Sequence, residues 1–164
     1  MKKLMIQSII ALLAIGLVGL VVGCRSTKSE ADESKGATRV TLDQLSAPAR
    51  ATVQKVTSGG KVEKIDKEME HGKLIYDVEA TVGGKHVEYA IADADGTILG
   101  TETSIEFSEL PQPVRAAAEK YFGSSTGLKA MKGVEDGKTH YEVEGKKNGK
   151  TAEVTFDPSG KRTE

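Results

Sequence analysis

Apolar and polar residues alternate strictly along several segments of the chain, a pattern typical of half-buried β-strands. In residues 74–82, apolar residues such as Leu74, Tyr76 and Val78 occupy every second position, and most residues between them are polar. A second alternating run covers residues 87–91. Gly83 and Gly84 separate the two runs, which predicts a two-residue hairpin turn. The same pattern returns later in the chain around Asn148 and Gly149, so we expect antiparallel hairpins in both places.

Two other segments follow helical spacing. In each, apolar residues recur at i, i+4 and i+7, and a proline stands in the first turn, where a missing amide proton costs little. We expect each helix to pack on the sheet face that carries a tyrosine, Tyr76 or Tyr141. The helices are marked by Pro48, Ala49, Val53 and Val56, and by Pro113, Val114, Ala118 and Tyr121.

The chain resembles itself at a fixed offset. Pro48 recurs 65 positions later as Pro113, and further residues recur at the same spacing: Arg50, Ala51, Lys55, Gly72, Lys73, Tyr76, Val78, Glu79, Gly84, Lys85 and Glu88. This density of identities indicates a duplication. The sequence therefore predicts an α+β fold of two tandem repeats, residues 40–100 and 105–164, joined by residues 101–104. Each repeat is expected to be a helix followed by a three- to four-stranded antiparallel sheet.

The repeats resemble a known family. The chain is similar to the PepSY-like domain, itself described as similar to β-lactamase inhibitor proteins, and the likeness is strongest in the second repeat. The residues that carry it are Leu110, Pro111, Val114, Ala117, Tyr121, the run 141–144 and the turn 157–160. The first repeat departs from the pattern at Ser46, where the second has Pro111. The resemblance implies an extracytoplasmic binding or inhibitory module and supplies no catalytic residues.

The N-terminus is predicted to be a lipoprotein signal. Lys2 and Lys3 precede an apolar run that ends at Cys24, and residues 21–24 resemble the lipobox that is cleaved before a lipid-modified cysteine. Residues 1–23 would then be removed, and Cys24 would anchor the protein to a membrane through its acyl chains. The alternative is an uncleaved transmembrane helix, because residues 4–22 are long enough to span a bilayer.

Residues 24–39 are predicted to be a lipidated cysteine and a flexible stalk, because apolar residues are almost absent from them. Cleavage would remove Lys2 and Lys3 from 23 basic residues and leave 21 against 24 acidic ones. This balance gives no basic field for nucleic acid. We expect a location in the cell envelope outside the cytoplasm, and on the outer membrane facing the periplasm in a Gram-negative cell, since Arg25 follows the cysteine.

Candidate catalytic chemistry is weak. The single cysteine, Cys24, would be acylated, and His71, His86 and His140 lie in or beside hairpins with no serine motif nearby. They also lack the spacing of zinc ligands. We interpret them as surface or turn histidines and expect neither an enzyme, nor a metal, nor a cofactor.

One partial motif resembles a calcium loop. Five residues match positions of an EF-hand, but the first position is Ile91 and both flanks have the pattern of strands rather than helices. A turn at the end of a strand is therefore the preferred interpretation. The matching residues are Asp93, Asp95, Gly96, Ile98 and Glu102.

The hairpin turns fix which residues face each other on the sheet. Counting back from Gly83 and Gly84 places Glu79 opposite Glu88, and the same count around the later turn places Glu144 opposite Glu153. The earlier hairpins place Lys64 beside Glu79 and Lys129 beside Glu144. Facing carboxylates repel, so each lysine is expected to compensate its pair. Asp77 and Glu142 lie nearby on the same face.

These acidic positions are the candidate partner-binding residues. The simple interpretation is a solvated charge ladder that contributes little. The functional hypothesis is a non-catalytic module that binds another exported protein or peptide through its acidic sheet faces, with inhibition of that partner left open. The alternative is an envelope sensor of a small ligand or cation. The candidate residues are Asp77, Glu79, Glu88, Glu142, Glu144 and Glu153.

Overall fold

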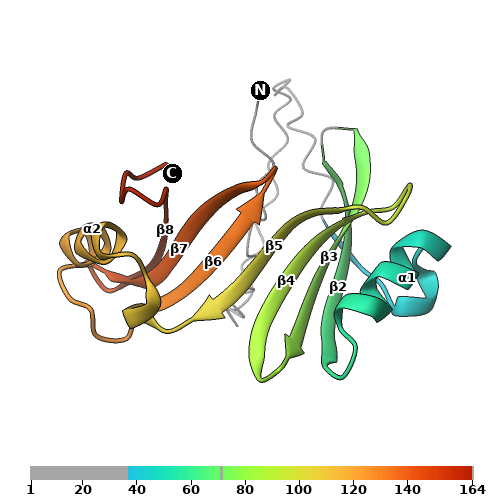
Figure 1. The fold of residues 1–164 in the computed structure, drawn as a ribbon, viewed down its shortest axis with the longest axis horizontal. Coiled ribbons are helices and arrows are strands. Elements are labelled where there is room, and N and C mark those ends of the chain that lie inside the picture. The colour runs from blue at the N-terminus through green and yellow to red at the C-terminus, as the bar shows by residue number, and fades with distance from the viewer. Residues whose placement is uncertain (1–36, 71, 164) are drawn as a thin grey trace, which may run out of the picture.

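One eight-stranded antiparallel sheet forms the centre of the molecule (Figure 1). A computed structural model describes residues 37–70 and 72–163. The strands follow one another in the sheet in the order of the sequence. They are β1 (Thr38–Arg39), β2 (Lys61–Glu70), β3 (Lys73–Val82), β4 (Lys85–Ala92), β5 (Ile98–Ile105), β6 (Lys129–Glu135), β7 (Lys138–Lys147) and β8 (Lys150–Phe156). The helices are α1 (Ala47–Val56) and α2 (Gln112–Phe122), each preceded by a short 3-10 turn, Leu42–Gln44 or Phe107–Glu109.

The prediction of two tandem helix-plus-sheet repeats, each with its own sheet, is wrong. Strand β5 pairs with β4 on one side and with β6 on the other, so a single sheet runs through the whole chain. Thr101, in the segment expected to be a linker, lies opposite Tyr89 and also opposite Val134. The physical reason is that two separate sheets would each leave a row of unpaired backbone groups at this edge, and pairing satisfies both.

Both helices begin and end where the sequence allows. The hydroxyl of Ser46 accepts the amide of Ala49 at the start of α1, and prolines occupy the first turn of both helices, as predicted. Gly123, with a φ of 82°, ends α2 in the left-handed conformation that glycine adopts without strain.

The two helices cover the same face of the sheet. Pairing across the strands aligns Val78 of β3, Tyr89 of β4, Thr101 of β5 and Val134 of β6 on one face. This face carries two apolar clusters, one beneath each helix. The α1 cluster contains Leu45, Ala49, Val53, Ile65, Tyr76, Val78 and Ile91, and the α2 cluster contains Leu110, Val114, Ala118, Ala130, Val143, Val154 and Phe156. Tyr76 is buried and Tyr141 packs against the second cluster, which confirms that the helices lie over the tyrosines.

The turn between β4 and β5 fastens the sheet to α1. Gly96 has a φ of 71°, and its carbonyl accepts the Thr52 hydroxyl at 2.8 Å. A Cβ at this position would lie 2.5 Å from the carbonyl oxygen of Pro48, which is inside any real contact distance. Glycine is therefore required here for its conformation and for its size.

Two glycine-to-alanine variants separate these requirements. Gly84 has a φ of 78° but open space around its Cβ position, so Gly84→Ala should cost only the left-handed strain, about 1 kcal/mol. Gly96→Ala adds the clash with α1 and should lower the free energy of unfolding by roughly 2 kcal/mol more. Urea unfolding of both variants checks this. Equal losses would mean that α1 moves away freely.

Candidate partner-binding face

The face opposite the helices carries a row of carboxylates across neighbouring strands. Lys64 of β2 faces Glu79 of β3, which faces Glu88 of β4, which faces Glu102 of β5. The row continues through Gly133 of β6 to His140 of β7. These positions alternate with those of the apolar clusters, so they lie on the helix-free face. We call this the acidic face. Within it, we call Glu102 together with Glu88 of β4 and His140 of β7 the seam.

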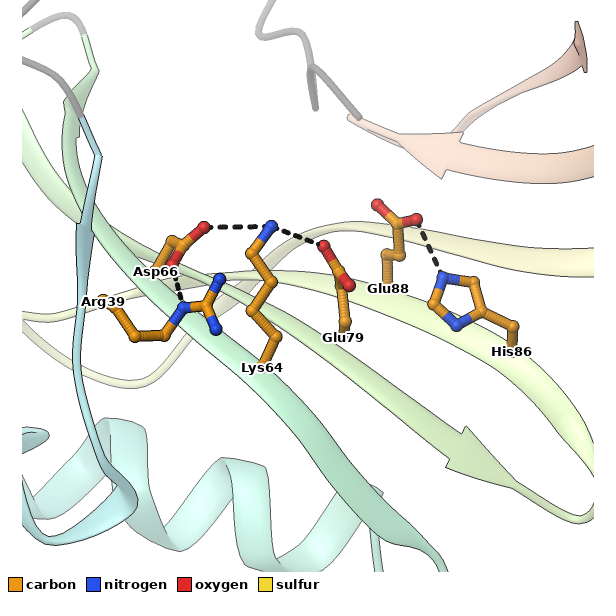
Figure 2. A network of polar contacts seen from close by, with 6 residues as sticks. All are labelled: Arg39, Lys64, Asp66, Glu79, His86 and Glu88. Carbon is orange, nitrogen blue, oxygen red and sulfur yellow. Dashed lines mark hydrogen bonds and ion pairs between the residues drawn. The ribbon is translucent and has the colours of Figure 1, made fainter. Parts of the chain in front are cut away.

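The β2 end of the acidic face is compensated by basic side chains (Figure 2). The Lys64 ammonium lies 2.8 Å from Glu79 Oε1 and 3.0 Å from Asp66 Oδ2, and Arg39 Nε donates to Asp66 Oδ1 at 2.7 Å. Although burial opposes it, these two donors hold the pKa of Asp66 below its ordinary value. The predicted pairing of Lys64 with Glu79 is confirmed.

The other predicted pairs also form. Glu79 faces Glu88, Glu144 faces Glu153, and Lys129 lies 3.1 Å from Glu144. Lys129 is exposed, so its ion pair contributes little stability. The predicted registers of the two sets of acids are therefore confirmed, and the pairing of β5 with β6 places both sets on one face of the sheet. Their partner-binding role stays a prediction.

Two histidines contact carboxylates of the seam. His86 Nε2 lies 3.0 Å from Glu88 Oε1, and His140 Nε2 lies 2.9 Å from Glu102 Oε1. The His86 side chain is 37% exposed, in keeping with a surface histidine, but that of His140 is only 14% exposed. The interpretation of His140 as a surface or turn residue is therefore wrong, because its ring folds across β6 onto Glu102. His71 lies outside the described residues.

Glu102 is the principal residue that sequence reasoning missed. The residue is 2% exposed, and its Oε2 is buried with no hydrogen-bond partner. The sequence placed it in a linker or at the last position of the calcium-like motif. The β-branched residues Thr101, Thr103 and Ile105, at every second position, were the available signal for a strand.

Burial keeps protons on two of the candidate acids. Burial, followed by the charges of Glu102 and Glu153, raises the pKa of Glu142 to about 10. Burial and a hydrogen bond with Glu68 raise the pKa of Asp77 to about 8. Burial also raises the pKa of Glu88, and Glu102 raises it further while His86 opposes the rise. The acidic face is therefore partly protonated at neutral pH, despite its sequence.

The calcium-like segment is a turn, which confirms the preferred interpretation. Asp93 Oδ1 accepts the Tyr76 hydroxyl at 2.6 Å, and Asp95 Oδ1 accepts the Thr97 amide at 2.9 Å. These bonds hold the turn that contains Gly96, while Glu102 lies farther along β5 on the acidic face. In residues 37–70 and 72–163, no group of three His, Cys, Asp or Glu side chains is arranged to hold a metal ion.

No protein-family model and no curated protein match the chain. Among solved structures, a crystal structure from Bacteroides vulgatus, described as a "putative periplasmic protein of unknown function", is 22% identical with a TM-score of 0.34. That match covers 79% of this chain and 98% of the other. A TM-score this low supports no inference about function. In the part of the chain that the structure describes, neither helix is long and apolar enough to cross a membrane.

Proposed function

We propose that this chain is a non-catalytic binding module of the cell envelope, held to a membrane by lipid on Cys24, whose acidic face docks a basic exported protein or peptide. The observation that carries the proposal is the continuous acidic face, which the helices leave uncovered. Cys24 lies outside the described residues, so the anchor rests on the lipobox-like sequence alone. The resemblance to PepSY-like domains points to the same class, and inhibition would follow where docking covers a partner's active site.

The charge on the face supports a basic partner. Aligned carboxylates lower the potential above a sheet, attract a cationic surface from a distance and accelerate its association. The two lysines that compensate the face, Lys64 and Lys129, lie on β2 and β6 and pair with Glu79 and Glu144. Glu88 and Glu153 are paired with neither lysine in these contacts. Glu88 is bonded instead to His86, and Glu153 to Glu142, so a docking partner can supply a lysine or arginine cation to both.

The test is capture by the intact lipidated protein in its own membranes. We expect a variant with Glu79, Glu88, Glu144 and Glu153 all changed to glutamine to lose most crosslinking to its partner. The rate of association should fall about tenfold or more, and its dependence on salt should flatten. These association rates are measured by flowing the purified partner over immobilised protein at several salt concentrations.

A second variant controls for charge away from the face. Glu119 on α2 and Asp95 in the β4–β5 turn are both exposed, so Glu119→Gln with Asp95→Asn should leave capture unchanged. The asparagine keeps a side-chain oxygen for the turn. Binding of the quadruple variant at unchanged rate and affinity would reduce the acidic face to a solvated surface. Metabolic fatty-acid labelling that persists after Cys24→Ser would separately refute the anchor.

A further inference from the structure

Glu102 occupies the middle of the acidic face, and one of its oxygens lacks a donor. Its strand, β5, lies between β4 and β6, and its side chain faces Glu88 on one side and Gly133 on the other. Oε1 is bonded to His140, whereas Oε2 is buried with no hydrogen-bond partner. A buried carboxylate oxygen without a donor costs free energy that a correctly placed ligand donor recovers.

On the β6 side, Glu102 is covered by the imidazole of His140 and not by a side chain of β6 itself. Gly133 has no side chain, and a Cβ there would lie 2.1 Å from His140 Nε2. The imidazole ring therefore occupies the space beside Glu102 that a side chain on β6 would otherwise fill. A side chain, unlike a backbone strand, can turn aside by rotamer change to admit a ligand.

The charge of Glu102 acts on three neighbouring acids. Burial first, and the charge of Glu102 in addition, raise the pKa of Glu88, Glu142 and Glu153, which come from β4, β7 and β8. His86 on β4 and His140 on β7 complete the titratable groups bonded to this cluster. Glu102 is thus the one carboxylate whose charge acts on all three of these acids. The ion pairs of Lys64 and Lys129 involve other acids, Glu79 and Glu144.

We propose that Glu102, with Glu88 beside it, receives the guanidinium of a single arginine side chain from the docking partner. Arginine is the cation suited to this place. Its planar group offers five donors, loses its hydration more readily than an ammonium, and can bridge carboxylates from separate strands. The inference rests on the proposed function, because it names the side chain by which a basic partner is recognised at the acidic face.

The experiment uses the intact lipidated protein in detergent micelles and a pentapeptide probe, N-acetyl-Gly-Gly-Arg-Gly-Gly-amide, whose only charge is the guanidinium. Titration followed by amide chemical shifts measures affinity and locates binding together. We expect shifts concentrated at Glu102, Gly133 and His140. The same peptide with citrulline, which has the shape of arginine without its charge, should bind at least about tenfold more weakly, and a lysine peptide should bind more weakly than arginine.

A variant at the site sharpens the test. Glu102→Gln keeps an oxygen for His140 but replaces the unpartnered acceptor with a donor, so affinity for the arginine peptide should fall about tenfold or more. Glu119→Gln on α2 removes the same charge far from the face and should change nothing. The citrulline comparison is made on the unaltered protein, so it decides the matter even if Glu102→Gln fails to fold.

Three outcomes overturn the inference. The citrulline peptide binds as tightly as the arginine peptide, Glu102→Gln leaves the affinity for the arginine peptide unchanged, or the arginine peptide causes no chemical-shift changes at the seam. None of them bears on the proposed docking role, which fails if the quadruple glutamine variant captures its partner normally. Conversely, normal capture by that variant together with seam shifts would leave an arginine site without the docking role.

Discussion

Replacing Glu142 with glutamine is expected to stabilise the protein above neutral pH, by an amount on the order of 3 kcal/mol at pH 8. Glu142 is buried on the acidic face, and burial together with the charges of Glu102 and Glu153 holds its pKa near 10. An unfolded chain would release this proton near the ordinary value of 4.5. Holding it in the fold therefore costs stability, and glutamine has no proton to hold.

The direction of the pH dependence follows from the same shift. Between about 4.5 and 10 the folded state binds more protons at Glu142 than the unfolded state, so the free energy of unfolding falls as pH rises through this window. Asp77, with its pKa raised to about 8 from 3.8, adds to the same slope across the lower part of the window. Below pH 4.5 both states are protonated at Glu142, and the penalty vanishes.

Urea unfolding at pH 5, 7 and 9 measures this effect. The unaltered protein should lose stability steadily across the series, and Glu142→Gln should flatten much of the loss while matching the unaltered protein near pH 5. Glu119→Gln, exposed on α2, is the matched control and should keep the original slope. Equal stability of Glu142→Gln and the unaltered protein at pH 9 would show that Glu142 ionises freely in the fold.

Local features of the fold could be predicted because short turns determine register. The two glycines at 83 and 84 fix a two-residue hairpin, so the pairing of Glu79 with Glu88 follows by counting along two strands. The same argument succeeds around Asn148, whose φ of 53° suits the turn. Helix positions could be predicted for a similar reason, since apolar spacing and a first-turn proline are signals contained within about ten residues.

Features that depend on distant pairing could not be predicted. Strand β6 follows β5 only after α2, so no hairpin turn fixes their register, and the pairing of Glu102 with Gly133 has no local signal. The contact of His140 with Glu102 then depends on two pairings, β5 with β6 and β6 with β7, plus the absence of a side chain at Gly133. Because the pairing of β5 with β6 was not predicted, the position of Glu102 at the centre of the acidic face was not predicted either.

The shared sheet also makes a prediction about cooperativity. Thr103 lies in β5 opposite Val87 on one side and Lys132 on the other, so both edges of its strand are occupied. A proline in such a strand removes a ladder hydrogen bond and crowds its neighbour. Thr103→Pro should therefore lower the free energy of unfolding by about 3 kcal/mol or more.

Thr103→Pro should destabilise both ends of the sheet, because β5 is the only strand that joins β4 to β6 in the described sheet. Amide hydrogen exchange should accelerate in Thr103→Pro at Val78, beneath α1, and at Val143, beneath α2. Thr103→Ala keeps the backbone donor and should leave both sites protected, which separates the strand effect from loss of the side chain. If Val143 kept its protection while Val78 lost it, the two apolar clusters would be independent folding units, and their common sheet would join them in space without coupling their stability.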